Sequence, residues 1–286
     1  MKLSVVYFSP TGGTRKACMN LAAAMAAEDA SSGAAAAAVV PGEMSAEAAA
    51  VSEAASVSGA SAAAIREVDL SHVDAECVFG PEDTVIVGMP VFGGRIPAFG
   101  AGKLKLLKGN GAAAVTAAVY GNRAFEDALL ELGDSLKEQG FKIAAGTALL
   151  AEHSMARDIG AGRPDEEDKE DMKSFAARIC EKLKMKGRRE PEIPGDRPYR
   201  EWKQMPVTPR ADDSCTACGL CAGQCPAGAI PADAPGSTMA ERCILCMRCV
   251  SVCPVRARSL PEPALAMLAQ KLSAVRDIRR ENELFL

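Results

Sequence analysis

Eight of the eleven cysteines in this chain of 286 residues occur in two copies of one motif. Each copy has three cysteines separated by two residues and then, after three more residues, a fourth cysteine followed by proline. Thiolates at this spacing can reach three iron corners of one cubane if the chain wraps tightly around it. The spacing therefore predicts a pair of 4Fe-4S clusters. The copies are Cys215, Cys218, Cys221 and Cys225-Pro226, and Cys243, Cys246, Cys249 and Cys253-Pro254.

The fourth cysteine of each motif lies in a Cys-Pro turn and must ligate iron away from its own three neighbours. In proteins with two such clusters, it serves the cluster of the other motif. We therefore predict crossed ligation. One cluster is assigned to Cys215, Cys218, Cys221 and Cys253, and the other to Cys243, Cys246, Cys249 and Cys225.

Zinc sites and a disulfide framework are the alternatives for these cysteines. A zinc site would use paired Cys-x-x-Cys knuckles, with no reason for a third cysteine at the same spacing or for two Cys-Pro steps. Disulfides need an oxidising compartment, whereas residues 1–20 contain no apolar signal-peptide core. We expect a cytoplasmic protein with thiols available to iron. The isolated Cys18, Cys77 and Cys180 are predicted to be packing residues.

The length of the chain suits one α/β domain and a small second module. Hydrophobic residues make up 48% and charged residues 24%, and no apolar run approaches the length of a membrane-spanning helix. The formal net charge of -4 disfavours a nucleic-acid partner.

Apolar runs rich in β-branched residues alternate with helical patterns along residues 1–186. This alternation predicts an α/β fold, a doubly wound parallel sheet with helices on both faces. The predicted strands cover Leu3–Phe8, Ile65–Leu70, Thr84–Met89, Ala112–Val119 and Lys142–Leu149, and the predicted helices cover Arg15–Glu28, Ala124–Gln139 and Asp165–Met185.

Residues 30–64 are rich in alanine and of low complexity, so we interpret them as an insertion between the first helix and the second strand. The alternative is that Ala34–Val40 is the true second strand. A second module follows at 212–258, with the cysteine motifs. The last segment, 259–286, is predicted to be a helix with one apolar face, made of Leu265, Leu268, Leu272 and Val275.

Residues 187–211 are rich in proline and glycine, which predicts a semi-rigid linker between the two domains. Tyr199 and Trp202 lie in this linker. We expect these aromatic side chains to pin it to a flanking domain. Shielding of a redox centre is the alternative role.

The loop Ser9-Pro10-Thr11-Gly12-Gly13-Thr14 joins the first predicted strand to the first predicted helix. Its hydroxyls and backbone N–H groups at a helix N-terminus predict an anion site. It lacks the Gly-Lys-Ser/Thr of a Walker loop, and its glycines do not fit the dinucleotide fingerprint. The alternative is a glycine-rich turn capped by Thr14.

Two more loops follow predicted strands, and the carboxyl ends of strands form the ligand crevice of an open α/β sheet. They are Pro90-Val91-Phe92-Gly93-Gly94 and Tyr120-Gly121-Asn122-Arg123. Phe92 and Tyr120 could offer aromatic faces to a planar ring, and the glycines permit close approach of backbone donors. A phosphate site beside a site for a flat ring predicts flavin mononucleotide (FMN).

These three loops make residues 1–186 resemble a flavodoxin domain, and the cysteine motifs make residues 212–258 resemble a bacterial two-cluster ferredoxin. The whole chain resembles the flavodoxin-ferredoxin fusion proteins of anaerobic bacteria and archaea. The resemblance implies that the first loop binds the FMN phosphate and that the other two flank the isoalloxazine ring. Pro10 departs from the pattern because it removes one backbone donor.

His153 follows the fifth predicted strand and is one of only two histidines. A proton-donor role is conceivable there, and a hydrogen-bonded structural role is the alternative. The leading functional hypothesis is an electron-transfer iron-sulfur flavoprotein that relays electrons between two 4Fe-4S clusters and FMN. Its partner would be a redox protein or a small electron acceptor. The alternatives are an FMN-dependent reductase of a small acceptor such as a quinone, and a redox- or oxygen-sensing module.

Overall fold

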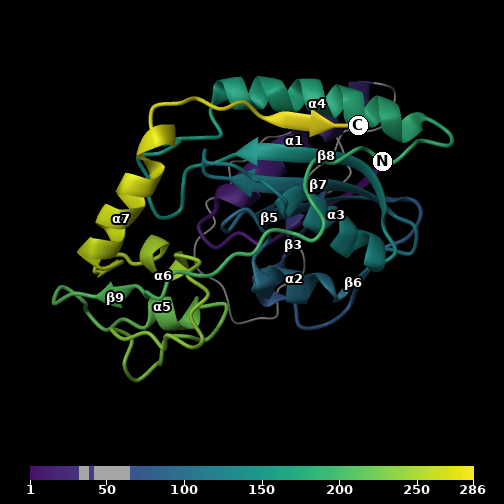
Figure 1. Cartoon of the computed structure of the whole chain (residues 1–286). Coiled ribbons are helices and arrows are strands. Elements are labelled where there is room, and N and C mark those ends of the chain that lie inside the picture. Colours follow the sequence, from purple (N-terminus) through teal and green to yellow (C-terminus); the bar gives the residue numbers. More distant parts are fainter. Residues whose placement is uncertain (32–38, 42–64) are drawn as a thin grey trace.

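The computed structural model describes residues 1–31, 39–41 and 65–286 (Figure 1). Most of the predicted insertion over 30–64 lies outside these residues. A seven-stranded sheet dominates the N-terminal part, with the order β11-β8-β7-β5-β1-β3-β2. Its strands are β1 (Lys2–Tyr7), β2 (Val39–Pro41), β3 (Ile65–Asp69), β5 (Asp83–Pro90), β7 (Ala113–Tyr120), β8 (Lys142–Leu150) and β11 (Glu283–Phe285).

Five consecutive strands of this sheet, β3-β1-β5-β7-β8, are parallel. Numbered along the chain they follow the order 2-1-3-4-5, which is the flavodoxin-like topology. β3 pairs with β1, so the predicted strand at Ile65–Leu70 is the second strand of this core. The alternative strand at Ala34–Val40 lies mostly outside the described residues, and its last two residues belong to the short β2, which pairs with β3 on the side away from β1.

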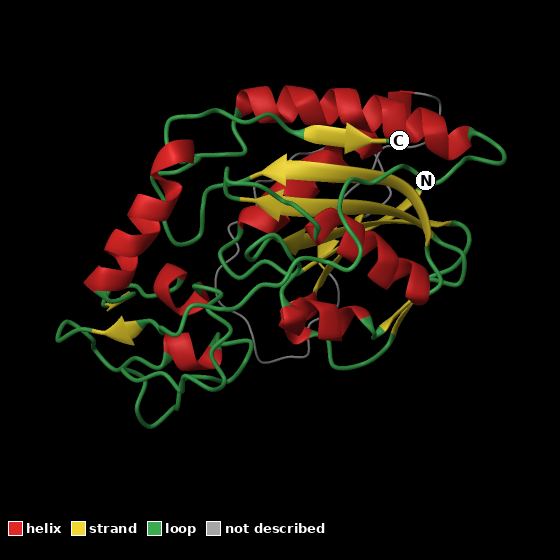
Figure 2. Ribbon diagram, in the orientation of Figure 1, coloured by secondary structure: helices red, strands yellow, loops and turns green. Residues whose placement is uncertain are grey.

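Helices cover both faces of the sheet (Figures 1 and 2). α1 (Gly13–Ser31) and α4 (Glu166–Lys184) lie together on one face, and α2 (Ala98–Leu104) and α3 (Ala128–Glu138) lie on the other. Every residue of β7 is buried, as expected for a central parallel strand between two helical layers. The predicted doubly wound fold is confirmed.

Local signals set the helix boundaries. Asp165 caps α4 through a capping box with Asp168, so this helix begins as predicted. α3 begins at Ala128 instead of the predicted Ala124, because Glu126 has a positive φ of 46° and so lies outside the helical region. Smaller elements complete the domain: η1 (Leu70–His72), β4 (Cys77–Val78) and β6 (Leu107–Lys108). Within the described residues, no helix has the length and apolar character needed to cross a membrane.

The cysteine-rich segment contains only short elements. α5 (Leu220–Gly223) and α6 (Arg248–Ser251) are four residues long, and β9 (Arg210–Ala211) pairs antiparallel with β10 (Arg258–Ser259). The arrowheads of β7 and β8 point toward the side of the molecule where this segment lies (Figure 2). The cysteines therefore lie near the carboxyl ends of the parallel strands.

The C-terminal segment differs from the single helix predicted over 259–286. α7 (Glu262–Leu272) and η2 (Ser273–Val275) are followed by a turn and by β11, which pairs antiparallel with β8. Of the predicted apolar face, Leu272 is buried and Leu268 and Val275 are half-buried, whereas Leu265 is exposed. The strand ends the helical pattern because its backbone bonds to the sheet edge and Leu284 packs on the core.

Candidate functional site

The loop between β1 and α1 exposes backbone donors at a helix N-terminus. Ser9 Oγ accepts a hydrogen bond from the Arg15 amide at 2.9 Å, and the Gly12 carbonyl accepts one from Lys16 at 2.9 Å. The first turn of a helix has four N–H groups without intrahelical acceptors. The amides of Gly13 and Thr14 lie in this first turn at the edge of the cavity, and such donors without intrahelical acceptors suit an anion such as phosphate.

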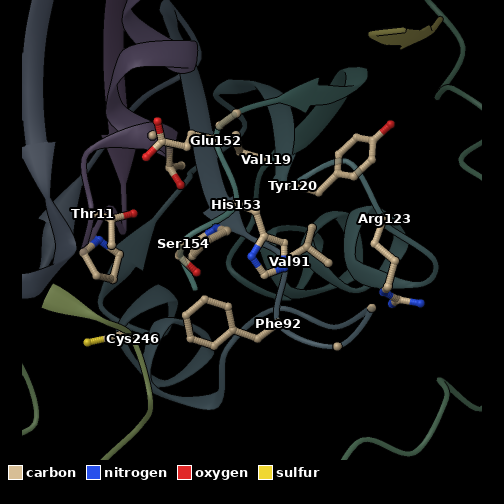
Figure 3. Close-up of a pocket in the computed structure, with 18 of the residues that line it drawn as sticks. Thr11, Val91, Phe92, Val119, Tyr120, Arg123, Glu152, His153, Ser154 and Cys246 are labelled. Atoms are coloured by element: carbon tan, nitrogen blue, oxygen red, sulfur yellow. The ribbon is translucent and has the colours of Figure 1, made fainter. Parts of the chain in front are cut away.

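A cavity opens beside this loop and contains about 660 Å³ of space, part of it open to solvent. The three predicted loops meet around it, together with the segment after β8 and one cysteine from the ferredoxin-like segment (Figure 3). Its lining comprises Pro10, Thr11, Gly13, Thr14, Pro90, Val91, Phe92, Gly93, Gly94, Val119, Tyr120, Gly121, Arg123, Ala124, Ala151, Glu152, His153, Ser154 and Cys246.

Three predicted cofactor residues do not line this cavity. Ser9 caps α1 instead, and Gly12, whose φ of +89° favours glycine, faces an adjoining cavity. The side-chain amide of Asn122 donates to the carbonyls of Val275 and Ile278 at 2.8 and 2.7 Å. It therefore anchors the C-terminal segment.

The two predicted aromatic faces have different roles in the structure. The Tyr120 ring packs edge-on against Phe125, with centroids 5.6 Å apart, and points away from Phe92 and His153 (Figure 3). Tyr120 nevertheless lines the cavity, so a face presented by it to a planar ring stays a prediction. The Phe92 ring lies at the cavity, and the centroid of the Trp202 ring lies 6.5 Å from that of Phe92. Phe92 therefore offers an aromatic surface to a ring ligand.

The linker is fastened to the α/β domain, as predicted. The Tyr199 hydroxyl donates to Asp134 at 2.7 Å, and the Asp127 carboxylate accepts the Arg200 amide at 2.7 Å. Trp202 lies against Gly93, where an added Cβ would come within 1.8 Å of the indole. Trp202 therefore pins the linker beside Gly93 and Phe92, two residues that line the cavity.

His153 faces the cavity from the segment after β8. Its Nδ1 accepts hydrogen bonds from the amides of Met155 and Ala156 at 3.2 and 3.1 Å. Burial, helped by the charge of Arg123, lowers the pKa of His153 to about 4. The imidazole is therefore neutral at pH 7, and with Nδ1 as acceptor its proton lies on Nε2. It can donate a hydrogen bond into the cavity, but it holds no extra proton to transfer.

The eight motif cysteines surround two small cavities in crossed groups. One cavity, with about 300 Å³ of space, is lined by Cys215, Cys218, Cys221 and Cys253. The other, with about 330 Å³, is lined by Cys225, Cys243, Cys246 and Cys249. These are the two groups that the crossed assignment predicts. Within the described part of the chain, no group of three or more His, Cys, Asp or Glu residues is placed to hold a single metal ion.

The two motifs share one backbone course. Positive φ angles occur at equivalent positions, at Ala217 and Leu245, at Gly219 and Met247, and at Gly228 and Arg256. These left-handed residues turn the chain sharply between cysteines, as wrapping around a cluster requires. Backbone amides also point at sulfur, since Leu245 donates to Cys243 at 3.4 Å and Ala229 donates to Cys225 at 3.2 Å.

The thiols of Cys225, Cys243, Cys246 and Cys249 are suited to ligate a positively charged group such as iron. Burial raises the pKa of Cys246 to about 12, and electrostatic repulsion from Cys249, Cys225 and Cys243 contributes to the rise. Burial also raises the pKa of Cys243 and Cys249. Close thiolates are unfavourable without a positive charge among them, and iron would supply that charge as it displaces the protons.

The two motifs differ in their surroundings. Cys218 is exposed, whereas Cys246 is buried and lines both its own cavity and the cavity of the three loops. Arg248 fastens this contact, because its guanidinium approaches the Ser9 carbonyl at 3.5 Å and Asp69 at 3.6 Å. Nothing in the cysteine spacing distinguishes the motifs in this way, so the position of Cys246 could not be predicted.

Comparisons with known proteins agree with the cysteine pattern. Residues 214–258 match the family of 4Fe-4S dicluster domains. Over 60 residues the chain is 38% identical to the DNA-directed RNA polymerase subunit Rpo3 of Methanosarcina acetivorans, a match that covers 20% of this chain and 22% of that protein. The chain thus spans about a fifth of the length of that curated relative.

Solved structures align with the N-terminal part. A flavodoxin from the domain Archaea covers 65% of this chain and 100% of its own, with 15% identity and a TM-score of 0.38. The Streptococcus pneumonia TIGR4 flavodoxin covers 64% and 99%, with 15% identity and a TM-score of 0.36. The NAD(P)H:quinone oxidoreductase from Methanothermobacter marburgensis covers 66% and 99%, with 11% identity and a TM-score of 0.34.

These scores are low, so the fold is assigned by the strand order 2-1-3-4-5 and not by the likenesses. The C-terminal assignment rests on the family match and on the two motifs. The chain therefore joins an α/β domain of flavodoxin-like topology to a C-terminal domain of the 4Fe-4S dicluster family, the architecture of a flavodoxin-ferredoxin fusion.

Proposed function

We propose that this protein is an electron-transfer iron-sulfur flavoprotein that relays electrons between two 4Fe-4S clusters and FMN. When bound, the flavin exchanges one or two electrons and each cluster exchanges one at a time. The observation that carries the proposal is the position of Cys246. This residue lines the cavity of the second cysteine group and also the cavity of the three loops.

The residues around the larger cavity divide into two ends. The amides of Gly13 and Thr14 and the hydroxyl of Thr11 would hold the FMN phosphate at the N-terminus of α1. Phe92 and the neutral His153 would flank the ring, the first by packing and the second by donating from Nε2. Because the lining supplies neutral donors at one end and an aromatic face at the other, it fits FMN.

The exposure of the cysteines supports an order in which electrons pass between a redox partner, the two clusters and the flavin. The group of Cys225, Cys243, Cys246 and Cys249 adjoins the flavin cavity and would hold the proximal cluster. The group of Cys215, Cys218, Cys221 and Cys253 lies apart from it and includes the exposed Cys218. A redox partner would exchange electrons at this distal group, and the flavin would be reached only through the proximal one.

Ligand binding tests the assignment of FMN. We expect FMN to bind at least about tenfold more tightly than riboflavin, because charge-assisted hydrogen bonds to a phosphate are worth about 1.5–3 kcal/mol. Quenching of flavin fluorescence measures both affinities with the same protein. Equal affinities for the two flavins would contradict the phosphate site.

The relay is tested by removing one ligand of the distal group. Cys218→Ala is reconstituted with iron, sulfide and FMN under anaerobic conditions, and reduced ferredoxin is mixed with it in a stopped-flow instrument. We expect the flavin band to bleach at least tenfold more slowly than in the wild type, while FMN affinity is unchanged. Cys77→Ala is the matched control, because Cys77 lies outside both cysteine groups. Wild-type bleaching in Cys218→Ala would refute the relay.

A reductase of a small acceptor is the second candidate function. It is favoured by the adjoining cavity, which contains about 830 Å³ of space partly open to solvent and is lined by Lys16, Arg157, Met247 and Val250 among others. A small acceptor could enter there beside the flavin. Steady-state oxidation of reduced ferredoxin by a soluble quinone, at rates that saturate with quinone, would favour the reductase over a simple carrier.

A further inference from the structure

Arg258 is a buried cation inside the cysteine-rich segment, only 2% exposed. Its guanidinium donates to the carbonyls of Pro235, Pro209 and Ser237 at 2.5, 3.0 and 3.3 Å and to the Thr238 hydroxyl. Its Nε has no hydrogen-bond partner. Among the ion pairs of the described residues, none includes Arg258. A buried charge without a carboxylate partner is costly, so something else must offset it.

Sulfur atoms of both cysteine groups lie around this cation. Arg258 Nη1 donates to Cys221 Sγ at 3.9 Å, and Arg258 lines the distal cavity. Cys221 packs with Cys249 of the proximal group in one small buried cluster. The guanidinium therefore contacts the distal group directly, and its sulfur contact Cys221 packs against Cys249 of the proximal group.

The repeat shows that an arginine is not required by the backbone here. The two motifs share their left-handed positions, and in this register Arg258 of Cys253-Pro254-Val255-Arg256-Ala257-Arg258 matches Ile230 of Cys225-Pro226-Ala227-Gly228-Ala229-Ile230. Ile230 is 5% exposed and packs against Cys221 and Cys249. The same place in the fold thus accepts an apolar side chain in one repeat and holds a cation in the other.

We propose that Arg258 is the shared countercharge of the two clusters and raises the reduction potential of both. This inference rests on the proposed binding of two clusters. Four thiolates give each cluster a negative charge that grows on reduction. A fixed cation buried nearby favours the added electron, and it does so more strongly than a cation in water would. Net charge and hydrogen bonds to sulfur are known determinants of cluster potential.

The test is a redox titration of the reconstituted full chain, followed by electron paramagnetic resonance of the clusters. In Arg258→Ile, which installs the side chain of the other repeat, we expect the equilibrium constant for reduction to fall at least tenfold at each cluster. That is about 59 mV per one-electron couple. Arg256→Gln is the matched control, because it removes the same charge from an exposed position of the same turn. It should leave both potentials near their wild-type values.

Iron and sulfide counts separate the possible failures. If the wild-type chain does not take up two clusters, the proposed function fails. If Arg258→Ile takes up both and its potentials equal those of the wild type, the countercharge role is refuted. If Arg258→Ile does not assemble, Arg258→Lys decides. Assembly in Arg258→Lys supports a need for the charge, whereas failure of both variants shows that the guanidinium acts only as a structural clamp on its carbonyl partners.

Discussion

The two halves of the molecule are held together in different ways. The α/β domain has long central strands, such as β5 and β7 with eight residues each, and two apolar cores on the faces of its sheet. The cysteine-rich segment has helices of four residues and strands of two. One of its small clusters consists of Cys221, Ile230 and Cys249 with a few partly buried neighbours. The first half folds by apolar burial, and the second depends on ligation.

The cysteine-rich segment is held against the α/β domain at several places. On its N-terminal side, the linker is fastened to α3 through Asp127 and Asp134. On its C-terminal side, β11 joins the sheet, and the side-chain oxygen of Asn282 accepts a hydrogen bond from the Leu150 amide at 2.9 Å. Between them, Cys246 and Ile244 pack on the α/β core. The sheet domain thus supplies the frame against which the weakly cored cysteine-rich segment is positioned.

Removal of iron should give the largest difference in stability between the two halves. With a chelator and reductant, we expect residues 212–258 to lose their protection from hydrogen exchange entirely, because short elements and small apolar clusters do not hold this segment once ligation to iron is gone. Amides of β5 and β7 should keep theirs. Hydrogen exchange followed by mass spectrometry measures both regions in one sample. Unchanged protection over 212–258 would show that this segment has a sufficient core of its own.

Arg163→Met should lower the stability of the α/β domain without affecting the cysteine-rich segment directly. Arg163 and Asp168 form a buried ion pair, with side chains 5% and 0% exposed and a contact of Nε to Oδ2 at 2.8 Å. Removing the cation leaves the buried Asp168 with only the more distant Arg279, at 4.0 Å, as an ion-pair partner, which costs up to about 3–5 kcal/mol of unfolding free energy. Urea denaturation measures the loss. Arg157→Met, which removes an exposed pair with Glu152, should cost less than about 1 kcal/mol.

The pH dependence of stability should report on His153, at the boundary of the halves. Its folded pKa of about 4 lies below the ordinary 6.5, so the unfolded chain takes up the proton first as the pH falls. The contribution is complete above pH 6.5 and is lost toward pH 4, by up to about 3 kcal/mol. His153→Asn keeps an acceptor for the Met155 amide but does not titrate. A variant that loses as much stability as the wild type over this range would refute the burial of a neutral imidazole.

Gly93→Ala should loosen the contact between the linker and the cavity. Gly93 has a φ of +60°, and a methyl group there would overlap Trp202. We expect a cost of about 1–3 kcal/mol and a red-shifted emission from Trp202, the only tryptophan. Gly102→Ala, in α2 with open space around it, should instead be neutral or slightly stabilising. Unshifted emission in Gly93→Ala would show that the indole does not pack on this loop.

The sequence alone was sufficient for features that depend on local spacing. The crossed grouping of the eight cysteines, the parallel sheet with helices on both faces and the meeting of the three loops at one edge follow from motif spacing and from alternating periodicity. Helix boundaries at Asp165 could be read from a capping residue. These features need only neighbours within a few residues or the general geometry of parallel strands.

Tertiary structure decided the rest, because side-chain direction and long-range pairing leave no local periodicity. Tyr120 turns into the core, Asn122 anchors the C-terminal segment, and residues 283–285 become an edge strand. The two cysteine motifs have the same spacing but different surroundings. Ile244 and Cys246 of the second motif pack on the α/β core, and this packing places the second motif beside the cavity of the three loops. The candidate ligands were thus encoded in sequence spacing, whereas the contact between the two candidate sites depends on the packing of the two domains.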